Sequence, residues 1–214
     1  DGVERYNADG GSVVVMESAT GAILAMSAVP SFNPQKYYEF DLNSYTNPVL
    51  SNLYEPGSTF KVLVMAAAVD EGIVKPETRC NICAGPITEG DYTIRTWNDK
   101  YFPNTTMRDV IVNSNNTGMV FVGRKLGLSG MIKYLEKFGI GKITGIDLQG
   151  EATGAMREEN SWYPIDLATA SFGQGISITP IQLLSAVNAI ANRGNLMTPY
   201  VVSQIITEEG YEID

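Results

Sequence analysis

Short apolar runs alternate along the chain with segments rich in glycine, proline and asparagine. Residues 12–16 (SVVVM) and 22–26 (AILAM) are two such runs joined by turn residues, and this pattern predicts a hairpin of two largely buried strands. Pro30 and Pro34 end the pattern, because proline has no N–H to give to a strand ladder. Residues 35–53 are polar and aromatic without a clear period, so we expect an extended loop there.

Eight consecutive apolar residues occupy positions 62–69 and predict a helix that ends near Gly72. A helix with apolar side chains on every side is expected inside a domain, and this one is too short to cross a bilayer. Gly57 breaks the preceding element, so Ser58 falls at the start of a new one. Ser58 and Lys61 are three residues apart and should lie on one face at the mouth of this helix.

The rest of the pattern predicts a loop-rich segment followed by helices. Residues 73–105 contain three prolines and both cysteines, and we expect a flap with one short strand at 92–97. Thr106 and Thr179 are expected to cap helices, the latter in a capping box with proline at the first helical position. Helical segments are expected at 107–112, 119–127, 129–138, 165–172 and 180–191, and a final strand at 200–206.

This succession of hairpin, helical middle and final strand indicates an α+β or α/β protein. We expect one partial domain over residues 1–214, with a sheet hairpin at 12–28 and a mostly helical region at 58–194 that contains the flap at 73–105. The chain opens on Asp1 and not on methionine, and it ends abruptly. We interpret it as an excised piece, with any targeting segment outside it.

Composition and charge narrow the functional classes. The net charge is −9 and the charges are scattered, which argues against nucleic acid or an anionic membrane surface as the partner. The absence of histidine excludes a Ser-His-Asp triad and a histidine-based metal site. Cys80 and Cys83 form a single C-x-x-C, too few ligands for zinc, so a structural pair such as a local disulfide is favoured over a metal site. No metal and no cofactor is expected.

Ser58 and Lys61 are the candidate reactive pair. A serine hydroxyl is a poor nucleophile until a base takes its proton, and a lysine in apolar surroundings has a lowered pKa that suits it to that role. The simpler interpretation is an N-cap serine beside a lysine that reaches to water. Ser114-Asn115-Asn116 is the one other polar cluster of this kind, between two predicted helices.

Taken together, these motifs resemble those of the class B penicillin-binding proteins, in the family's order and over essentially the whole chain. The segments that carry the resemblance are Tyr54-Glu55-Pro56-Gly57-Ser58-Thr59-Phe60-Lys61, Thr20-Gly21-Ala22-Ile23-Leu24-Ala25-Met26 with Pro30-Ser31-Phe32, Ser114-Asn115-Asn116, Thr144-Gly145-Ile146-Asp147-Leu148 with Gly150-Glu151, Gly173-Gln174-Gly175, and Thr179-Pro180 with Gln182.

The resemblance implies a D,D-transpeptidase domain of the penicillin-binding protein and serine β-lactamase-like fold, in which a sheet packs against a helical subdomain. Ser58 is then the acylated nucleophile, Lys61 its base, Ser114 a proton shuttle and Asn116 the residue that holds the substrate amide. The Ser58 N–H is implied as an oxyanion-hole donor. The implied partners are D-Ala-D-Ala stem peptides, β-lactams and a membrane-anchored cell-wall complex on the extracytoplasmic face of the bacterial membrane.

The family's third motif, K-T-G, is absent from the sequence, because Lys142-Ile143-Thr144-Gly145 carries an inserted residue and matches a different family segment. The resemblance implies that the K-T-G strand follows Asp214. We therefore expect the C-terminal strands and the substrate-carboxylate site to be missing, and this fragment to be inactive or weakly active. Two alternatives stay open: a non-catalytic penicillin-binding sensor or scaffold, and a serine β-lactamase or carboxypeptidase.

Overall fold

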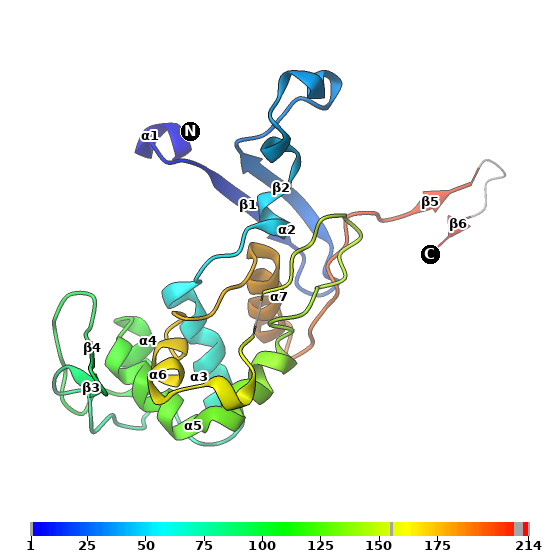
Figure 1. Cartoon of the computed structure of the whole chain (residues 1–214). Coiled ribbons are helices and arrows are strands. Elements are labelled where there is room, and N and C mark those ends of the chain that lie inside the picture. The colour runs from blue at the N-terminus through cyan, green and yellow to red at the C-terminus, as the bar shows by residue number, and fades with distance from the viewer. Residues whose placement is uncertain (1, 155, 208–211, 214) are drawn as a thin grey trace. The chain divides into compact units, whose positions relative to one another are not determined.

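The computed structural model describes residues 2–154, 156–207 and 212–213, and Figure 1 labels its helices and strands. The chain divides into two compact units. The first comprises Asp1–Leu53, Lys142–Thr153 and Thr179–Asp214, and the second comprises Tyr54–Gly141 and Gly154–Ile178.

The first unit opens with a short helix, α1 (Gly2–Tyr6), and a two-stranded hairpin. Strands β1 (Gly11–Met16) and β2 (Ile23–Val29) pair antiparallel, as the sequence predicts. The expectation that both strands are largely buried is wrong, since Val13 and Leu24 are each 65% exposed. One face of the hairpin packs on the core while the other stays open, as is common for antiparallel strands.

Residues 35–53 contain short helices and not the expected extended loop. Asn33 and Asn47 each accept a hydrogen bond from the backbone N–H two residues on, at 3.0 Å, and proline follows each of them at the first helical position. The caps and the prolines stabilise short helices here, although the segment has no hydrophobic period. The helices are η1 (Pro34–Glu39), η2 (Leu42–Tyr45) and α2 (Pro48–Ser51).

The core of the first unit forms around α2 and α7 (Pro180–Ala191). Thr179 caps α7 in the predicted capping box with Gln182. Gln182 Nε2 also donates to Lys142 O at 2.6 Å, which ties the segment from residue 142 to α7. The buried cluster is Val49, Leu50, Ile146 and Ile181, and Val14, Met16, Ile23, Met26, Leu148 and Leu184 pack against it.

The strand predicted at 200–206 is wrong over most of its length. Tyr200 makes one parallel bridge to Ala22, and only β5 (Ile205–Ile206) is a strand, paired with β6 (Glu212–Ile213). The Asp147 carboxylate accepts the N–H groups of Val201 and Val202, at 2.8 and 2.7 Å. These donors are therefore not available to a strand ladder.

The second unit is mostly helical. Its long helix, α5, packs against α3, α4 and α6. Gly127, at φ +72° and ψ 168°, interrupts α5 where two separate helices were expected. Val62 and Val69 of α3 are 38% and 46% exposed, so α3 is buried on one side only. The helices are η3 (Gly57–Phe60), α3 (Lys61–Asp70), α4 (Met107–Val112), α5 (Asn116–Lys137), η4 (Glu159–Ser161) and α6 (Pro164–Ala170).

The flap between α3 and α4 is loop-rich, as expected. Cys80 and Cys83 are joined in a disulfide and are fully buried, which confirms the structural pair. Two short strands, β3 (Ile87–Glu89) and β4 (Tyr92–Ile94), form an antiparallel hairpin, so the strand predicted at 92–97 ends three residues early. In the described part of the chain, no helix combines the length and the hydropathy that crossing a bilayer requires.

Candidate active site

Ser58 and Lys61 lie where the backbone passes from the 3-10 helix η3 into α3. Ser58 is the second residue of η3, and its side chain is exposed. Lys61 is the first residue of α3 and is only 2% exposed. The backbone is continuous and helical between them, and the Lys61 N–H donates to Ser58 O. The exposed Ser58 hydroxyl therefore lies one helical turn before the buried Lys61 amine.

The Lys61 ammonium has three acceptors, which lie on Ser114, between α4 and α5, and on Asn116, the first residue of α5. Nζ donates to Ser114 O at 2.8 Å, to Ser114 Oγ at 2.9 Å and to Asn116 Oδ1 at 2.7 Å. An ammonium carries three N–H donors, so these contacts use them all. Three of the four residues predicted to form the site are therefore in direct contact.

Ser114 reaches Lys61 with two of its atoms because of its backbone conformation. Its φ is +50°, in the left-handed region that non-glycine residues seldom adopt and that often marks functional sites. The Ser114 N–H donates to Ile111 O, and Asn115 caps α5 by accepting from the Gly118 N–H at 2.9 Å. The end of one helix and the start of the next thereby hold Ser114 in place.

Asn116 has a fixed amide orientation. Its Nδ2 donates to Arg95 O at 2.9 Å, just beyond β4 of the flap. With Nδ2 held there, Oδ1 faces Lys61. One hydrogen of the Asn116 amide remains available for a ligand, because an –NH₂ group has two donors.

Burial lowers the pKa of Lys61 from its usual 10.5 to about 8. Removal from water disfavours the charged amine, while the three oxygen acceptors favour it. At pH 7 about one molecule in ten therefore carries a neutral Lys61. This is the range in which a lysine can take a proton from a substrate or a neighbouring hydroxyl.

The turn at residues 173–175 supports the backbone just before Ser58. The Gly57 N–H donates to Gly173 O at 2.9 Å, and the Gly175 N–H donates to Glu55 Oε1 at 2.8 Å. Gly173 has φ +81°, and a Cβ on it would lie 2.1 Å from Gly57 O. Sequence reasoning noted these residues only as parts of motifs and missed this positioning role.

Gly173→Ala is expected to lower the stability of the protein. The added methyl group meets a backbone carbonyl and sits at a positive φ, so the Tm should fall by roughly 5 °C or more. Gly85→Ala is the matched control, since nothing lies within 4 Å of its Cβ position. Thermal unfolding of both variants provides the measurement. An unchanged Tm in Gly173→Ala would contradict this packing.

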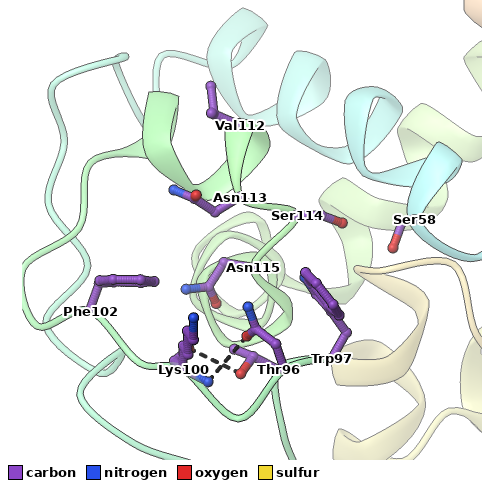
Figure 2. A pocket seen from close by; sticks show the side chains of 10 residues that line it. Ser58, Thr96, Trp97, Lys100, Phe102, Val112, Asn113, Ser114 and Asn115 are labelled. Atoms are coloured by element: carbon purple, nitrogen blue, oxygen red, sulfur yellow. Dashed lines mark hydrogen bonds between the residues drawn. The ribbon is translucent and has the colours of Figure 1, made fainter.

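A pocket of about 620 Å³ opens beside Ser58 and Ser114, which both line it (Figure 2). Ser58 Oγ has no hydrogen-bond partner among the described residues, and it makes no hydrogen bond to Lys61 Nζ. Reacting groups are often this loosely arranged in free enzymes. The flap supplies further lining residues, including Trp97, Lys100 and Phe102, which sequence reasoning missed because the segment has no periodic pattern. The described residues hold no cluster of three or more metal-ligating His, Cys, Asp or Glu side chains.

Comparison with known proteins supports the resemblance seen in the motifs. Residues 11–213 match the family model of the penicillin binding protein transpeptidase domain. The chain is 40% identical over 204 residues to stage V sporulation protein D of Bacillus subtilis and 32% identical over 212 residues to a peptidoglycan D,D-transpeptidase FtsI homolog of Mesostigma viride. These matches cover 94% of this chain but 31% and 36% of the relatives, so the chain spans about a third of their length.

The fold agrees with solved structures of the same family. The structure of penicillin binding protein 3 from Mycobacterium tuberculosis, complexed with aztreonam, matches with a TM-score of 0.92 and 27% sequence identity. That match covers 99% of this chain and 47% of the other. The mixed α+β architecture is therefore the penicillin-binding protein transpeptidase fold, and the chain belongs to the class B penicillin-binding protein transpeptidase family.

Proposed function

We propose that the full-length protein is a peptidoglycan D,D-transpeptidase that cross-links D-Ala-D-Ala stem peptides through an acyl-Ser58 intermediate. The observation that carries this proposal is the buried Lys61, with a pKa of about 8, one turn from an exposed serine. The family match supports the reaction class. The similar protein of Mesostigma viride is named a peptidoglycan D,D-transpeptidase FtsI homolog, which is the same reaction class.

In the proposed first step, Ser58 Oγ attacks the carbonyl carbon of the penultimate D-alanine and Lys61 takes its proton. The tetrahedral intermediate collapses, the terminal D-alanine leaves as an amine that accepts a proton through Ser114, and the acyl group stays on Ser58. In the second step the amine of an acceptor peptide attacks this ester and gives a proton to Lys61, the ester bond breaks, and Lys61 returns the proton to the Ser58 oxygen. Covalent catalysis of this kind divides one difficult substitution into two easier ones.

The contacts of Lys61 suggest how Ser114 takes part. The neutral amine has two N–H donors and a lone pair, so one of its three oxygen contacts must change when the proton leaves. The Ser114 hydroxyl can rotate and donate to the lone pair, whereas a carbonyl or amide oxygen cannot. Ser114 is therefore the neighbour that can exchange a proton with Lys61.

Asn116 and the Ser58 backbone complete the proposed site. The first hydrogen of Asn116 Nδ2 keeps its bond to Arg95 O, and the second donates to the substrate amide in our proposal. Ser58 lies in the first turn of η3, where backbone N–H groups have no intrahelical acceptor. Its N–H can therefore stabilise the oxyanion that forms after attack.

We infer that the protein works on the extracytoplasmic face of the bacterial membrane, within a membrane-anchored cell-wall complex. The disulfide between Cys80 and Cys83 supports an oxidising compartment. We also propose β-lactams as covalent inhibitors, since the similar penicillin binding protein 3 was solved in complex with aztreonam.

The test uses the full-length protein, benzylpenicillin and a donor peptide ending in D-Ala-D-Ala. We expect one added penicillin mass, on the peptide that contains Ser58. We also expect D-alanine release and a cross-linked product when an acceptor amine is present. D-alanine release without cross-linking would indicate a carboxypeptidase, and penicillin hydrolysis with rapid turnover would indicate a β-lactamase. Labelling without reaction of the donor would indicate a sensor.

The rate of penicillin acylation is expected to depend on the protonation of Lys61. A base works only when deprotonated, so the rate should rise about tenfold per pH unit up to about pH 8 and then level off. The same shift should increase the free energy of unfolding from pH 8 towards 10.5, because only the unfolded lysine keeps its proton there. Stopped-flow labelling from pH 6 to 10 measures the profile. A flat profile would exclude Lys61 as the base.

A further inference from the structure

The pocket beside Ser58 extends well past the residues that the proposed reaction uses. We call it the flap pocket, and it is lined by Ser58, residues 96–98, 100 and 102 of the flap, and residues 112–115. Its volume of about 620 Å³ lies within the usual range for small-molecule sites. The space is large enough to hold a side chain of a peptide whose reacting carbonyl lies at Ser58.

Three apolar side chains form much of the wall and remain exposed. Trp97, Phe102 and Val112 are 76%, 46% and 75% exposed. Figure 2 shows Trp97 near Ser58 and Ser114, with Phe102 at the opposite end. Exposed apolar groups gathered in a concave site are typical of ligand-binding surfaces. The wall favours an aliphatic chain running from the Trp97 end towards Phe102.

Lys100 is the one charged residue that lines the flap pocket. It forms no ion pair with any described residue. Its backbone is held on both sides: the Lys100 N–H donates to Asn98 Oδ1 at 3.1 Å, and Thr96 Oγ1 donates to Lys100 O at 3.0 Å. Figure 2 shows the side chain between Trp97 and Phe102. A single cation on a fixed turn selects for an anionic group and against an amine.

We propose that the flap pocket binds an aliphatic, carboxylate-bearing side chain of a stem peptide, with the carboxylate paired to Lys100 and the chain against Trp97 and Phe102. This inference rests on the proposed function and adds the substrate class that the site selects. A chain ending in a carboxamide keeps the apolar contacts but loses the charge. Discrimination between the two should be about three- to tenfold, as for an ion pair that is partly exposed to water.

The first experiment measures binding without reaction. Binding to the full-length protein is measured by isothermal titration calorimetry in a Ser58→Ala background, so that no acyl bond can form at Ser58. Two donor peptides are titrated, identical except for a carboxylate or a carboxamide at the end of one aliphatic side chain. We expect the carboxylate peptide to bind about three- to tenfold more tightly, Lys100→Gln to remove the difference, and Lys100→Glu to reverse it. Lys75→Gln, an exposed flap lysine outside the pocket, should keep the difference.

The second experiment locates the side chain on the donor or the acceptor. The same pair of side chains is placed on the donor, with acylation of Ser58 as the readout, and then on the acceptor amine, with cross-linking as the readout. A Lys100-dependent preference in either arm supports the inference and identifies the peptide. Equal binding and equal rates in both arms overturn it. In that case normal labelling of Ser58 by benzylpenicillin would leave the proposed function intact. Absence of labelling would contradict both the proposed function and the inference about the flap pocket.

Discussion

Ser58→Ala is expected to abolish covalent labelling by benzylpenicillin. The substitution removes the hydroxyl oxygen that we propose forms the ester, and loss of the nucleophile in a serine enzyme costs about 10⁶ in rate. Ser58 Oγ has no hydrogen-bond partner among the described residues, so the fold should be unaffected. Intact-protein mass spectrometry after penicillin treatment, with thermal unfolding alongside, provides the measurement.

Thr59→Ala is the matched control for this variant. Thr59 is the neighbouring exposed hydroxyl, and its Oγ1 donates to Pro56 O at 2.7 Å. Its removal should cost little stability and leave the adduct in place. An adduct that persists in Ser58→Ala, or that is lost only in Thr59→Ala, would contradict the assignment of Ser58.

Lys61→Arg is expected to lower the acylation rate at least about a hundredfold while keeping the fold. A guanidinium still donates to the oxygens of Ser114 and Asn116, but it cannot lose a proton in a protein. General-base catalysis typically contributes about 10²–10⁴ in rate. The remaining reaction should also lose its rise with pH towards 8.

The acylation rates and the Tm of Lys61→Arg are compared with those of Lys125→Arg. Lys125 is exposed on the neighbouring helix α5 and does not contact the site, so its substitution should change neither quantity. A normal rate in Lys61→Arg would mean that the residue acts through its charge alone. A large fall in its Tm would call for Lys61→Met, which removes the amine with less added volume.

Features set by neighbouring residues could be predicted from the sequence. Thr106 and Thr179 cap helices as expected, because a cap depends on residues only three positions away. The helix that begins near Ser58 follows from the same kind of local pattern. The caps at Asn33 and Asn47 are equally local, but their segment has no hydrophobic period, and the prediction of a loop rests on that period alone.

Features that depend on distant contacts could not be predicted from local patterns. The β-branched segment after Tyr200 has strand propensity, but a carboxylate more than fifty positions earlier, on Asp147, takes its N–H groups. The three contacts of Lys61 come from residues 114 and 116, which only the family resemblance brought into the site. The flap pocket depends on where a non-repetitive loop places Trp97 and Lys100, and no periodic signal encodes that.

The bond from Asn116 Nδ2 to Arg95 O has a thermodynamic consequence. Arg95 directly precedes Thr96, which lines the flap pocket. The Arg95 carbonyl accepts from the Asn116 amide, and the oxygen of the same amide accepts from Lys61, so these two hydrogen bonds connect the pocket wall to Lys61. A ligand that moved this carbonyl and turned the Asn116 amide would change one of the three oxygen contacts of Lys61, and with it the proton affinity of that amine. By thermodynamic linkage, protonation of Lys61 must then change the affinity of that ligand by the same factor by which the ligand changes the proton affinity of Lys61. Substrate recognition and activation of the base would then share one coupling free energy.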